Sequence, residues 1–402
     1  MSTPPANGKG TQKGGGFIPE LDGLRGFAVL FVILHHFWPE TGILAACPWL
    51  GDLGWIGVDL FFVISGFLIT GILLDTKEDP HYFRNFYARR ALRIFPLYYL
   101  YLAGVFIIPV LQHGPFFATP FVKSAGSPFW YLGYLSNIPE SLLGKSDPPF
   151  LLAPLWSLAI EEQFYLSFPS IVRKVNRATL ARIVIGLIFF APMFRLVSML
   201  LHPANERIQY LFTFSRLDVL AFGAGLALLF RTPALLPSQK FSARAALLSV
   251  IVFVVTFATG GLDRTTPFGR TLGYTVVGLT FAAILLWAMR HRSARATALL
   301  RATPLRYFGK LCYGLYLLHR PASIFLDVAL AKAHLHLEGV PLLALRIAVS
   351  VGVATLSWNL FERPLLRFKK SFEARKVSTA PPVQATLAAW KEPLLTPADP
   401  SS

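Results

Sequence analysis

Charged residues are scarce in this sequence. Of its 402 residues only 15% are Asp, Glu, Lys or Arg and 54% are hydrophobic, whereas about a quarter of the residues in an ordinary soluble domain are charged. The sequence also lacks a repeat of 20–50 residues, which argues against a solenoid, and a metal-binding pattern. We find no cleavable signal peptide before the first apolar run, so we expect that run to act as the targeting signal.

Apolar residues come in runs of about 18–22, the length of a helix that crosses a bilayer. Unpaired backbone groups are costly in lipid, and no ten-residue alternating segments recur, so these runs predict helices rather than a barrel. The segment Phe129–Ile138 is apolar but too short to span, which indicates an interfacial or re-entrant element. The sequence therefore predicts an all-α, polytopic membrane protein with about ten spans: Glu20–Trp38, Gly54–Leu74, Leu92–Leu111, Leu151–Val172, Ala181–Leu201, Leu211–Phe230, Arg244–Gly260, Arg270–Met289, Tyr307–Ala331 and Val340–Phe361.

The formal net charge of +17 is concentrated in alternate loops. The opposite loops carry few basic residues, namely Lys123, Lys145, Arg207, Arg264 and Lys332. Because basic residues favour the cytoplasmic side, this alternation predicts that both termini are cytoplasmic. The positive charge therefore does not have to be explained by binding to nucleic acid. The loops and tail expected in the cytoplasm contain Lys77, Arg84, Arg89, Arg90, Arg173, Lys174, Arg177, Arg231, Lys240, Arg290, Arg292, Arg295, Arg301, Arg363, Arg367, Lys369 and Lys370.

Three regions are expected along the chain. Residues 1–16 are rich in Gly, Ser, Pro and Lys and predict a disordered tail. Residues 17–370 form the membrane domain, and residues 371–402 form a cytoplasmic tail without periodicity. Cys47 and Cys312 are the only cysteines. We expect them on opposite sides of the membrane, so that they do not pair.

Several ionisable residues fall inside the predicted spans. Each central charge costs roughly 2.5–3.5 kcal/mol on insertion scales, whereas a Leu or Phe gains only about 0.3–0.6 kcal/mol. These side chains must therefore face one another or a wet cavity, which indicates a functional site. They are Arg25, His35, His36, Asp59, Glu161, Glu162, Arg195, Arg216, Asp218, His319 and Arg320.

Arg25 and His36 lie eleven residues apart in the first span. This spacing puts both on one helix face, separated by about 16 Å, with Arg25 near the cytoplasmic end. His35 and His36 cannot share a face, so at most one of them lies along the Arg25 stripe. The alternative is that Arg25 reaches lipid phosphates and His36 caps the helix in the interface.

Arg89, Arg90 and Arg93 stand at the start of the third span, and Arg90 and Arg93 are neighbours on a helix. One interpretation is the ordinary positive charge of a cytoplasmic loop. The other is a phosphate clamp, because the guanidinium group matches phosphate oxygens.

In the fourth span, Ser157, Glu161 and Tyr165 recur every four residues and predict a polar stripe. Glu162 points about 100° away from that stripe. The alternative for these carboxylates is a structural ion pair with a membrane arginine.

Five segments, occurring in the family's order, resemble the acyltransferase-3 family of bacterial membrane O-acyltransferases. One departure is that many members carry a fused extracytoplasmic hydrolase-like domain, for which we expect no room in this chain. The segments are Pro19–Gly26 followed by His36, Gly57–Ile69, Arg89–Pro96, Trp156–Tyr165 and Tyr313–His319.

The resemblance implies an enzyme of the bacterial cytoplasmic (inner) membrane that transfers an acyl group, commonly acetyl from acetyl-CoA, from the cytoplasmic side. The acceptor would be a hydroxyl of a glycan or related glycoside at the extracytoplasmic side. Acyl-CoA would be the donor substrate, and no metal ion is expected. The expected partners are membrane lipid and the glycan acceptor.

This function suggests a role for each candidate residue. His36 would take the acceptor's proton, because imidazole suits this task near neutral pH. Asp59 would orient that imidazole, and Glu161 would be the third catalytic candidate. The donor would be bound by Arg25, Arg89, Arg90 and Arg93. A polar substrate-binding lining would come from Arg216, Asp218 and His319.

Two other classes remain open. A secondary transporter also buries charges, but it favours internal repeats and broken helices at the midplane, and neither is evident here. A flippase of lipid-linked glycans or a non-enzymatic scaffold is the third interpretation. Release of coenzyme A by the purified protein would separate an enzyme from a transporter.

Overall fold

The computed structural model describes residues 18–113, 126–142, 150–292 and 294–372. The expected N-terminal tail lies outside these residues, as do Lys123, Lys145 and all but the first two residues of the expected C-terminal tail.

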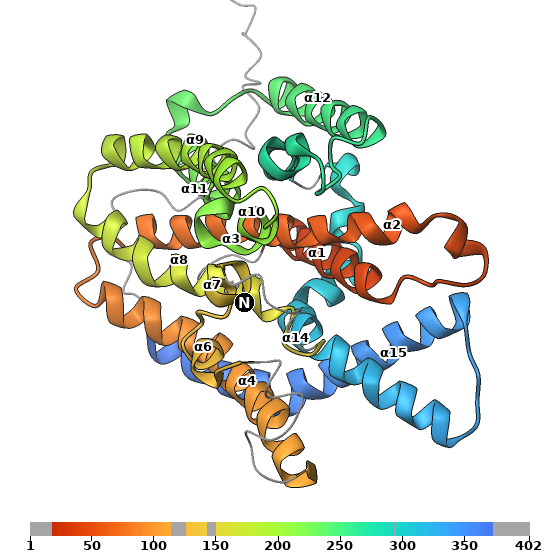
Figure 1. The fold of residues 1–402 in the computed structure, drawn as a ribbon. Helices are drawn as coiled ribbons and strands as arrows, with labels where there is room; N and C mark the ends of the chain where they lie inside the picture. The colour runs from red at the N-terminus through yellow and green to blue at the C-terminus, as the bar shows by residue number, and fades with distance from the viewer. Residues whose placement is uncertain (1–17, 114–125, 143–149, 293, 373–402) are drawn as a thin grey trace, which may run out of the picture.

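The described residues form helices and no strands, so the chain is an all-α membrane protein (Figure 1). Each of the ten predicted segments overlaps one helix of 13 or more residues. In chain order these helices are α1 (Pro19–Phe37), α3 (Ile56–Asp75), α4 (Tyr82–His113), α8 (Leu155–Lys174), α9 (Arg177–Leu201), α11 (Leu217–Leu229), α12 (Gln239–Ala258), α13 (Tyr274–Arg290), α14 (Thr303–Lys332) and α15 (Gly339–Ser357). Shorter helices between or after them include α2 (Pro48–Asp52), α6 (Pro128–Leu132), α7 (Asn137–Leu142), α10 (Arg207–Leu211) and α16 (Arg363–Leu366).

Six helical stretches of the described chain are long and apolar enough to cross a membrane on length and composition alone. The four long helices outside this set are α1, α8, α11 and α14. Polar residues lower the hydropathy of α1, α8 and α14, and α11 has only 13 residues. The protein is polytopic, and the number of ten spans stays a prediction. The six stretches are Pro48–Asp75, Tyr82–Ile107, Arg177–Leu201, Gln239–Ala258, Gly269–Arg290 and Gly339–Lys369.

The connections predicted to be cytoplasmic gather at one end of the bundle, which we call the basic end. Arg231, after α11, forms an ion pair of 2.6 Å with Asp75 at the end of α3. Lys77 donates a hydrogen bond to the carbonyl of Val175 between α8 and α9. In Figure 1 the α3–α4 and α8–α9 connections lie together on the left.

The remaining connections gather at the opposite end. The ring of Trp49 on α2 lies 5.6 Å from that of Phe257 at the end of α12. Asn205, after α9, donates to the carbonyl of Ser141 on α7. In Figure 1, α2 and the α14–α15 connection lie on the right. The loops thus alternate between two ends as the charge pattern predicts, while the assignment of one end to the cytoplasm stays a prediction.

Helix α14 packs closely on α1 through a glycine. A Cβ atom added at Gly309 would clash with the carbonyl oxygen of Asp22. Helices α3 and α11 approach each other in the same way, because Gly66 lies against the backbone of Leu220. Small residues permit such close contact between membrane helices. The first of these contacts brings the polar residues of α14 beside those of α1.

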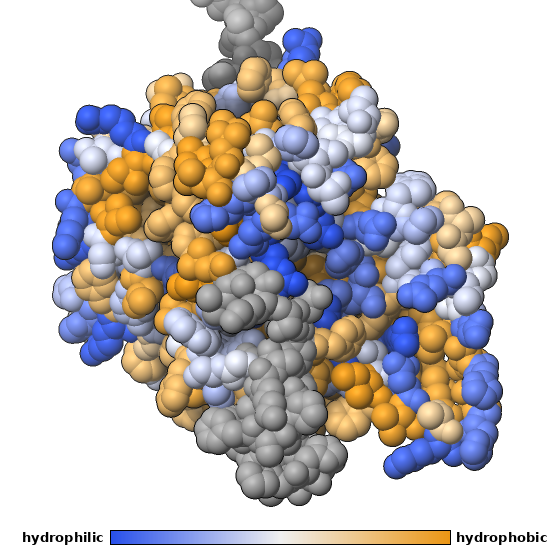
Figure 2. All heavy atoms as spheres, viewed as in Figure 1, coloured by the Kyte–Doolittle hydropathy of each residue, from blue (hydrophilic) through white to orange (hydrophobic). Residues whose placement is uncertain are grey.

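The outer surface of several helices is apolar. Leu247 on α12 is 63% exposed and Phe189 on α9 is 71% exposed, as expected for side chains that face lipid. Figure 2 shows hydrophobic side chains over α9 and the top of the molecule. Hydrophilic side chains gather in the middle of the same face, beside α10.

The segment Phe129–Ile138 does not span the bundle. It contributes to two short helices, α6 and the start of α7. Asn137 anchors the segment, donating to the carbonyl of Leu211 and accepting from Gln163 on α8 at 2.8 Å.

Candidate active site

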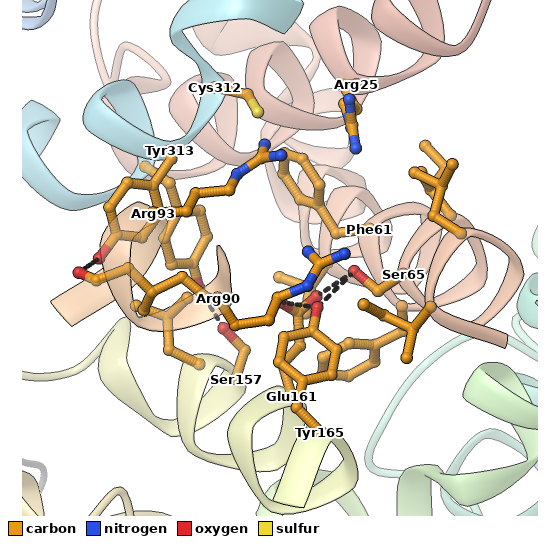
Figure 3. Close-up of a pocket in the computed structure, with 18 residues that line it drawn as sticks. Arg25, Phe61, Ser65, Arg90, Arg93, Ser157, Glu161, Tyr165, Cys312 and Tyr313 are labelled. Carbon is orange, nitrogen blue, oxygen red and sulfur yellow. Dashed lines mark hydrogen bonds between the residues drawn. The ribbon is translucent and has the colours of Figure 1, made fainter. Parts of the chain in front are cut away.

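One pocket between α1, α3, α4, α8 and α14 collects many of the predicted site residues (Figure 3). We call it the inner pocket. Its empty volume is about 780 Å³ with the mouth included. Its polar lining consists of Arg25, Ser65, Arg90, Arg93, Ser157, Glu161, Tyr165, Cys312, Tyr313 and Tyr316.

The charge of the inner pocket is mainly positive. Arg25, Arg90 and Arg93 line it together with a single acid, Glu161, and Figure 3 shows the three guanidinium groups on different sides of the same space. Three planar donors around one cavity suit an anionic ligand such as a phosphate ester. Arg89 does not line this pocket, and its Nε donates to the Asn85 carbonyl at 3.0 Å.

The carboxylate of Glu161 is held by two hydroxyl groups. Ser65 donates to it at 2.8 Å and Tyr165 at 3.0 Å, and the guanidinium of Arg90 lies 5.5 Å from the centre of the Tyr165 ring. Ser157 lines the same pocket, so the polar stripe on α8 that the spacing predicts is confirmed. Glu162 is not among the lining residues.

A second pocket leads from the inner pocket towards the basic end. Arg25, Arg93 and Tyr313 line both pockets, and Lys310 and Lys369 line only the second. Asp22 and Glu362 also line the second pocket, so its four basic side chains outnumber two acidic ones and favour an anionic molecule.

His36 lines a third pocket, on the side of the opposite end, which we call the His36 pocket. Val58 and Tyr316 are shared with the inner pocket and form the wall between the two. The hydroxyl of Tyr316 is 2.5 Å from that of Ser157, which fixes this wall across α8 and α14. The remaining polar lining comes from His35, Arg264 and Arg320.

The tautomer of His36 follows from a chain of hydrogen bonds. His319 Nδ1 lies 2.9 Å from the Tyr316 carbonyl, and a carbonyl can only accept, so Nδ1 carries the proton. His319 Nε2 of the neutral ring therefore accepts, and His36 Nδ1 donates to it at 2.8 Å. The lone pair of neutral His36 is therefore on Nε2, and this nitrogen can accept a proton.

Asp59 is not the partner of His36, which corrects the expected orienting role. Its carboxylate forms an ion pair with Arg216, and both side chains are fully buried. The guanidinium of Arg216 lies 4.4 Å from the centre of the Tyr274 ring. His319, expected in the substrate lining, is the side chain that contacts the imidazole of His36. The sequence could not identify this pair, because it depends on how α14 packs on α1.

Arg216 and Asp218 also differ from expectation. We predicted that they line a polar cavity, but neither lines the pockets described above. Asp218 instead pairs with Arg195 at 2.8 Å, with both side chains fully buried, and accepts from Thr275. These contacts join α9, α11 and α13, which is the structural ion pair that a buried membrane charge requires.

Several residues that line the His36 pocket carry no role in the sequence analysis. Tyr316 precedes His319 by three residues, so helical spacing could have placed it on the same face. Arg320 was recognised as a membrane charge, and its guanidinium lies 4.0 Å from the centre of the Phe150 ring. Arg264 belongs to a loop whose position depends on the fold. His35 also lines the His36 pocket, and its Nδ1 is 2.8 Å from the Gly51 carbonyl.

A wider pocket, which we call the outer pocket, continues from the His36 pocket towards the opposite end. Its empty volume is about 1690 Å³ with the mouth included. Trp55, Trp156, Tyr210 and Arg264 line both pockets. Among the described residues, no three His, Cys, Asp or Glu side chains are grouped as metal ligands.

Similarity to known proteins covers most of this chain. The model of a family described as "Acyltransferase domain" matches residues 18–360. YrhL of Bacillus subtilis is 32% identical over 376 residues, which cover 87% of this chain and 55% of that protein. The peptidoglycan O-acetyltransferase OatA of Listeria monocytogenes is 28% identical over 368 residues, covering 87% of this chain and 56% of the relative. The O-acetyltransferase OatA of Staphylococcus aureus is 30% identical over 374 residues, covering 89% and 58%. The chain thus spans little more than half the length of these relatives, and no solved structure matches it.

Proposed function

This chain belongs to the acyltransferase family that its residues 18–360 match, and from that premise we propose that it is a membrane O-acyltransferase. The donor in this proposal is acetyl-CoA on the cytoplasmic side. The acceptor is a hydroxyl group of a carbohydrate on the outer side of the bacterial cytoplasmic membrane. Support for the acetyl group and the carbohydrate comes from similar proteins named as O-acetyltransferases, among them a peptidoglycan O-acetyltransferase.

One observation carries the proposal: a series of adjoining pockets follows α1 from the basic end to the opposite end. Arg25 lines the pockets at the basic side and His36 lines the pocket beyond the Tyr316 wall. Eleven residues of helix separate them by about 16 Å. This is of the order of the length of a pantetheine arm. A donor whose phosphates bind the arginines could therefore extend its thioester towards His36.

The chemistry of the transfer follows from the tautomer of His36. Its Nε2 takes the proton from the acceptor hydroxyl while the hydroxyl oxygen attacks the thioester carbonyl carbon. The resulting tetrahedral intermediate collapses with cleavage of the C–S bond. The thiolate of coenzyme A then takes the proton from His36, and the acetyl ester leaves on the acceptor.

His319 acts on this reaction through His36. His319 accepts a hydrogen bond from His36 Nδ1, which keeps the basic lone pair of His36 on Nε2. The same hydrogen bond stabilises the imidazolium of His36 that forms during proton transfer. Because His319 has no exposed surface, it serves as a positioning residue.

The experiment uses the full chain in lipid nanodiscs with acetyl-CoA and soluble peptidoglycan fragments, and it measures release of the coenzyme A thiol. We expect acceptor-dependent release from the wild type. The double change Arg90→Gln and Arg93→Gln should raise the donor KM roughly tenfold or more, because each charge-assisted contact contributes about 1.5–3 kcal/mol.

Arg84→Gln is the matched control, since Arg84 is exposed on the same helix and lies outside the inner pocket. An unchanged donor KM in the double variant would mean that these arginines serve topology only. No release of coenzyme A with any acceptor would favour a transporter.

A further inference from the structure

The outer pocket has an aromatic wall. Trp156 and Tyr210 lie 4.8 Å apart between ring centres, and Tyr210 and Tyr274 lie 5.8 Å apart. Trp55 meets the edge of Tyr274 at 5.5 Å. Trp49 stands at the rim and is 46% exposed. Trp55, Trp156 and Tyr274 are buried and support the wall, whereas Trp49 and the half-buried Tyr210 offer ring faces to a ring-shaped ligand.

A buried carboxyl group with an unused oxygen also lines this pocket. Glu140 on α7 is 8% exposed, and no donor among the described residues reaches its Oε1. Burial raises the pKa of Glu140 to about 8, against the opposing effect of the Arg207 charge. Below that pH the carboxyl can both donate and accept a hydrogen bond, as a sugar hydroxyl also does.

Acidic groups outnumber basic ones at the entrance. Asp52, Glu206 and Asp263 are exposed and line the outer pocket. Of the basic groups, Arg207 interacts with the buried Glu140. The guanidinium of Arg264 lies 5.0 Å from the centre of the Tyr210 ring, at the passage to the His36 pocket. A ligand in the outer pocket thus meets three exposed carboxylates and two arginines, each of which already contacts another group of the pocket.

We propose that the outer pocket binds a carbohydrate whose sugar rings are uncharged and excludes a carbohydrate of the same size that has a carboxylate on every ring. The aromatic wall packs against the apolar faces of the rings, Glu140 exchanges hydrogen bonds with a hydroxyl, and the acidic rim repels carboxylates. The assignment of this ligand as the acyl acceptor rests on the proposed function, whereas binding of the ligand in the outer pocket does not depend on it.

The residues that line both the outer pocket and the His36 pocket would connect a bound sugar to His36. Trp55, Trp156 and Tyr210 continue from the outer pocket into the His36 pocket, so the rings stay on one aromatic surface up to the base. Arg264 also lines both pockets. The chemistry favours a carbohydrate over a lipid headgroup, because the acidic rim repels a phosphate as it repels a carboxylate.

The test is equilibrium binding of two labelled probes, chitotetraose and tetragalacturonate, to the full chain in nanodiscs without a donor. We expect chitotetraose to bind at least about fivefold more tightly, as repulsion from even one nearby carboxylate provides that much. The double change Asp52→Asn and Glu206→Gln should bring the two dissociation constants closer together. Trp49→Ala should weaken chitotetraose about fivefold, since it removes one aromatic contact.

Glu338→Gln is the matched control, because Glu338 is exposed at the same end but lies outside the outer pocket. Equal or tighter binding of tetragalacturonate to the wild type would overturn the proposal. Equal changes in the two dissociation constants for the pocket variants and for Glu338→Gln would also overturn the proposal. If chitotetraose binds as expected but coenzyme A is never released, the proposed function fails and the binding site stands.

Discussion

His36 is held in one tautomer by a partner that lies 283 residues away in the sequence. The Tyr316 carbonyl orients His319, and His319 in turn orients His36. If His36 is the base that we propose, the neutral His319 imidazole takes the place of the carboxylate that orients the histidine of a Ser-His-Asp triad. Because this chain of hydrogen bonds contains no carboxylate, the ring of His319 is buried beside His36 without a buried negative charge.

At the residue scale, His36→Ala should lower kcat about 10²–10⁴-fold while the protein still folds, because it removes the proton acceptor. His319→Ala should lower kcat less, since the base remains but loses its orientation. The double variant should be no worse than His36→Ala alone, because the two residues act as a unit. The measurement is coenzyme A release per folded protein.

His202→Ala is the control for these variants, since His202 is exposed after α9. Activity of His36→Ala within a few-fold of the wild type would remove His36 from the mechanism. Additive losses in the double variant would mean that His319 stabilises the fold and does not position the base.

Sequence reasoning succeeded where a single helix decides the geometry. The shared face of Ser157, Glu161 and Tyr165 follows from spacing within α8, and the structure confirms it. The partner of His36 is decided by contacts between helices, which depend on a glycine approach that no spacing shows. Asp59 lies on α3, and we predicted that it orients the imidazole of His36. Its partner Arg216 comes from α11, which packs closely on α3.

At the scale of elements, two buried ion pairs join the helices around the site. Asp59 and Arg216 connect α3 to α11, and Arg195 and Asp218 connect α9 to α11. Removing one member leaves the other charge buried without its partner, which is costly in a membrane. Replacing both members by apolar residues avoids that cost.

Arg216→Met should therefore destabilise the fold by about 3–5 kcal/mol, because the Asp59 carboxylate stays buried. Asp59→Leu combined with Arg216→Met should recover most of this loss. Thermal unfolding in detergent measures both. If the double variant is as unstable as Arg216→Met, the packing around the pair, and not its charge, supports the two helices.

Helix α8 carries two adjacent carboxylates with different surroundings. Glu161→Gln should lower kcat roughly tenfold or more, because it removes the only acidic charge that lines the inner pocket within the described chain and disturbs the bonds from Ser65 and Tyr165. Glu162→Gln should stay within a few-fold of the wild type, since Glu162 does not line that pocket. Activity per folded protein, measured for both variants side by side, tests the difference.

Both glutamates lie at nearly one depth of the same helix, so their insertion costs are similar and each variant controls for the other. Equal losses would favour one structural network that includes both carboxylates. A larger loss at Glu162 would contradict a role for the inner pocket in the reaction.

At the scale of the whole molecule, the pockets reach from one end of the bundle to the other but meet at a wall. Val58 and Tyr316 separate the inner pocket from the His36 pocket. The side towards the basic end is rich in arginine and lysine, and the other side is aromatic with acidic groups at its rim. In the proposed function each half binds a different reactant, and only a slender group such as an acyl thioester would have to pass between them.

This division predicts transfer across a sealed membrane. Proteoliposomes are filled with acetyl-CoA labelled in the acetyl group, and soluble peptidoglycan fragments are added outside. We expect label on the external fragments while the coenzyme A thiol stays inside, because the arginines hold the phosphates at the basic end and only the acetyl group crosses the wall. Vesicles that contain His36→Ala should release no thiol and label no fragment. Labelling only when donor and acceptor share one compartment would contradict the division between the two halves. The appearance of intact acetyl-CoA outside the vesicles would show that the molecule transports the donor instead of cleaving it.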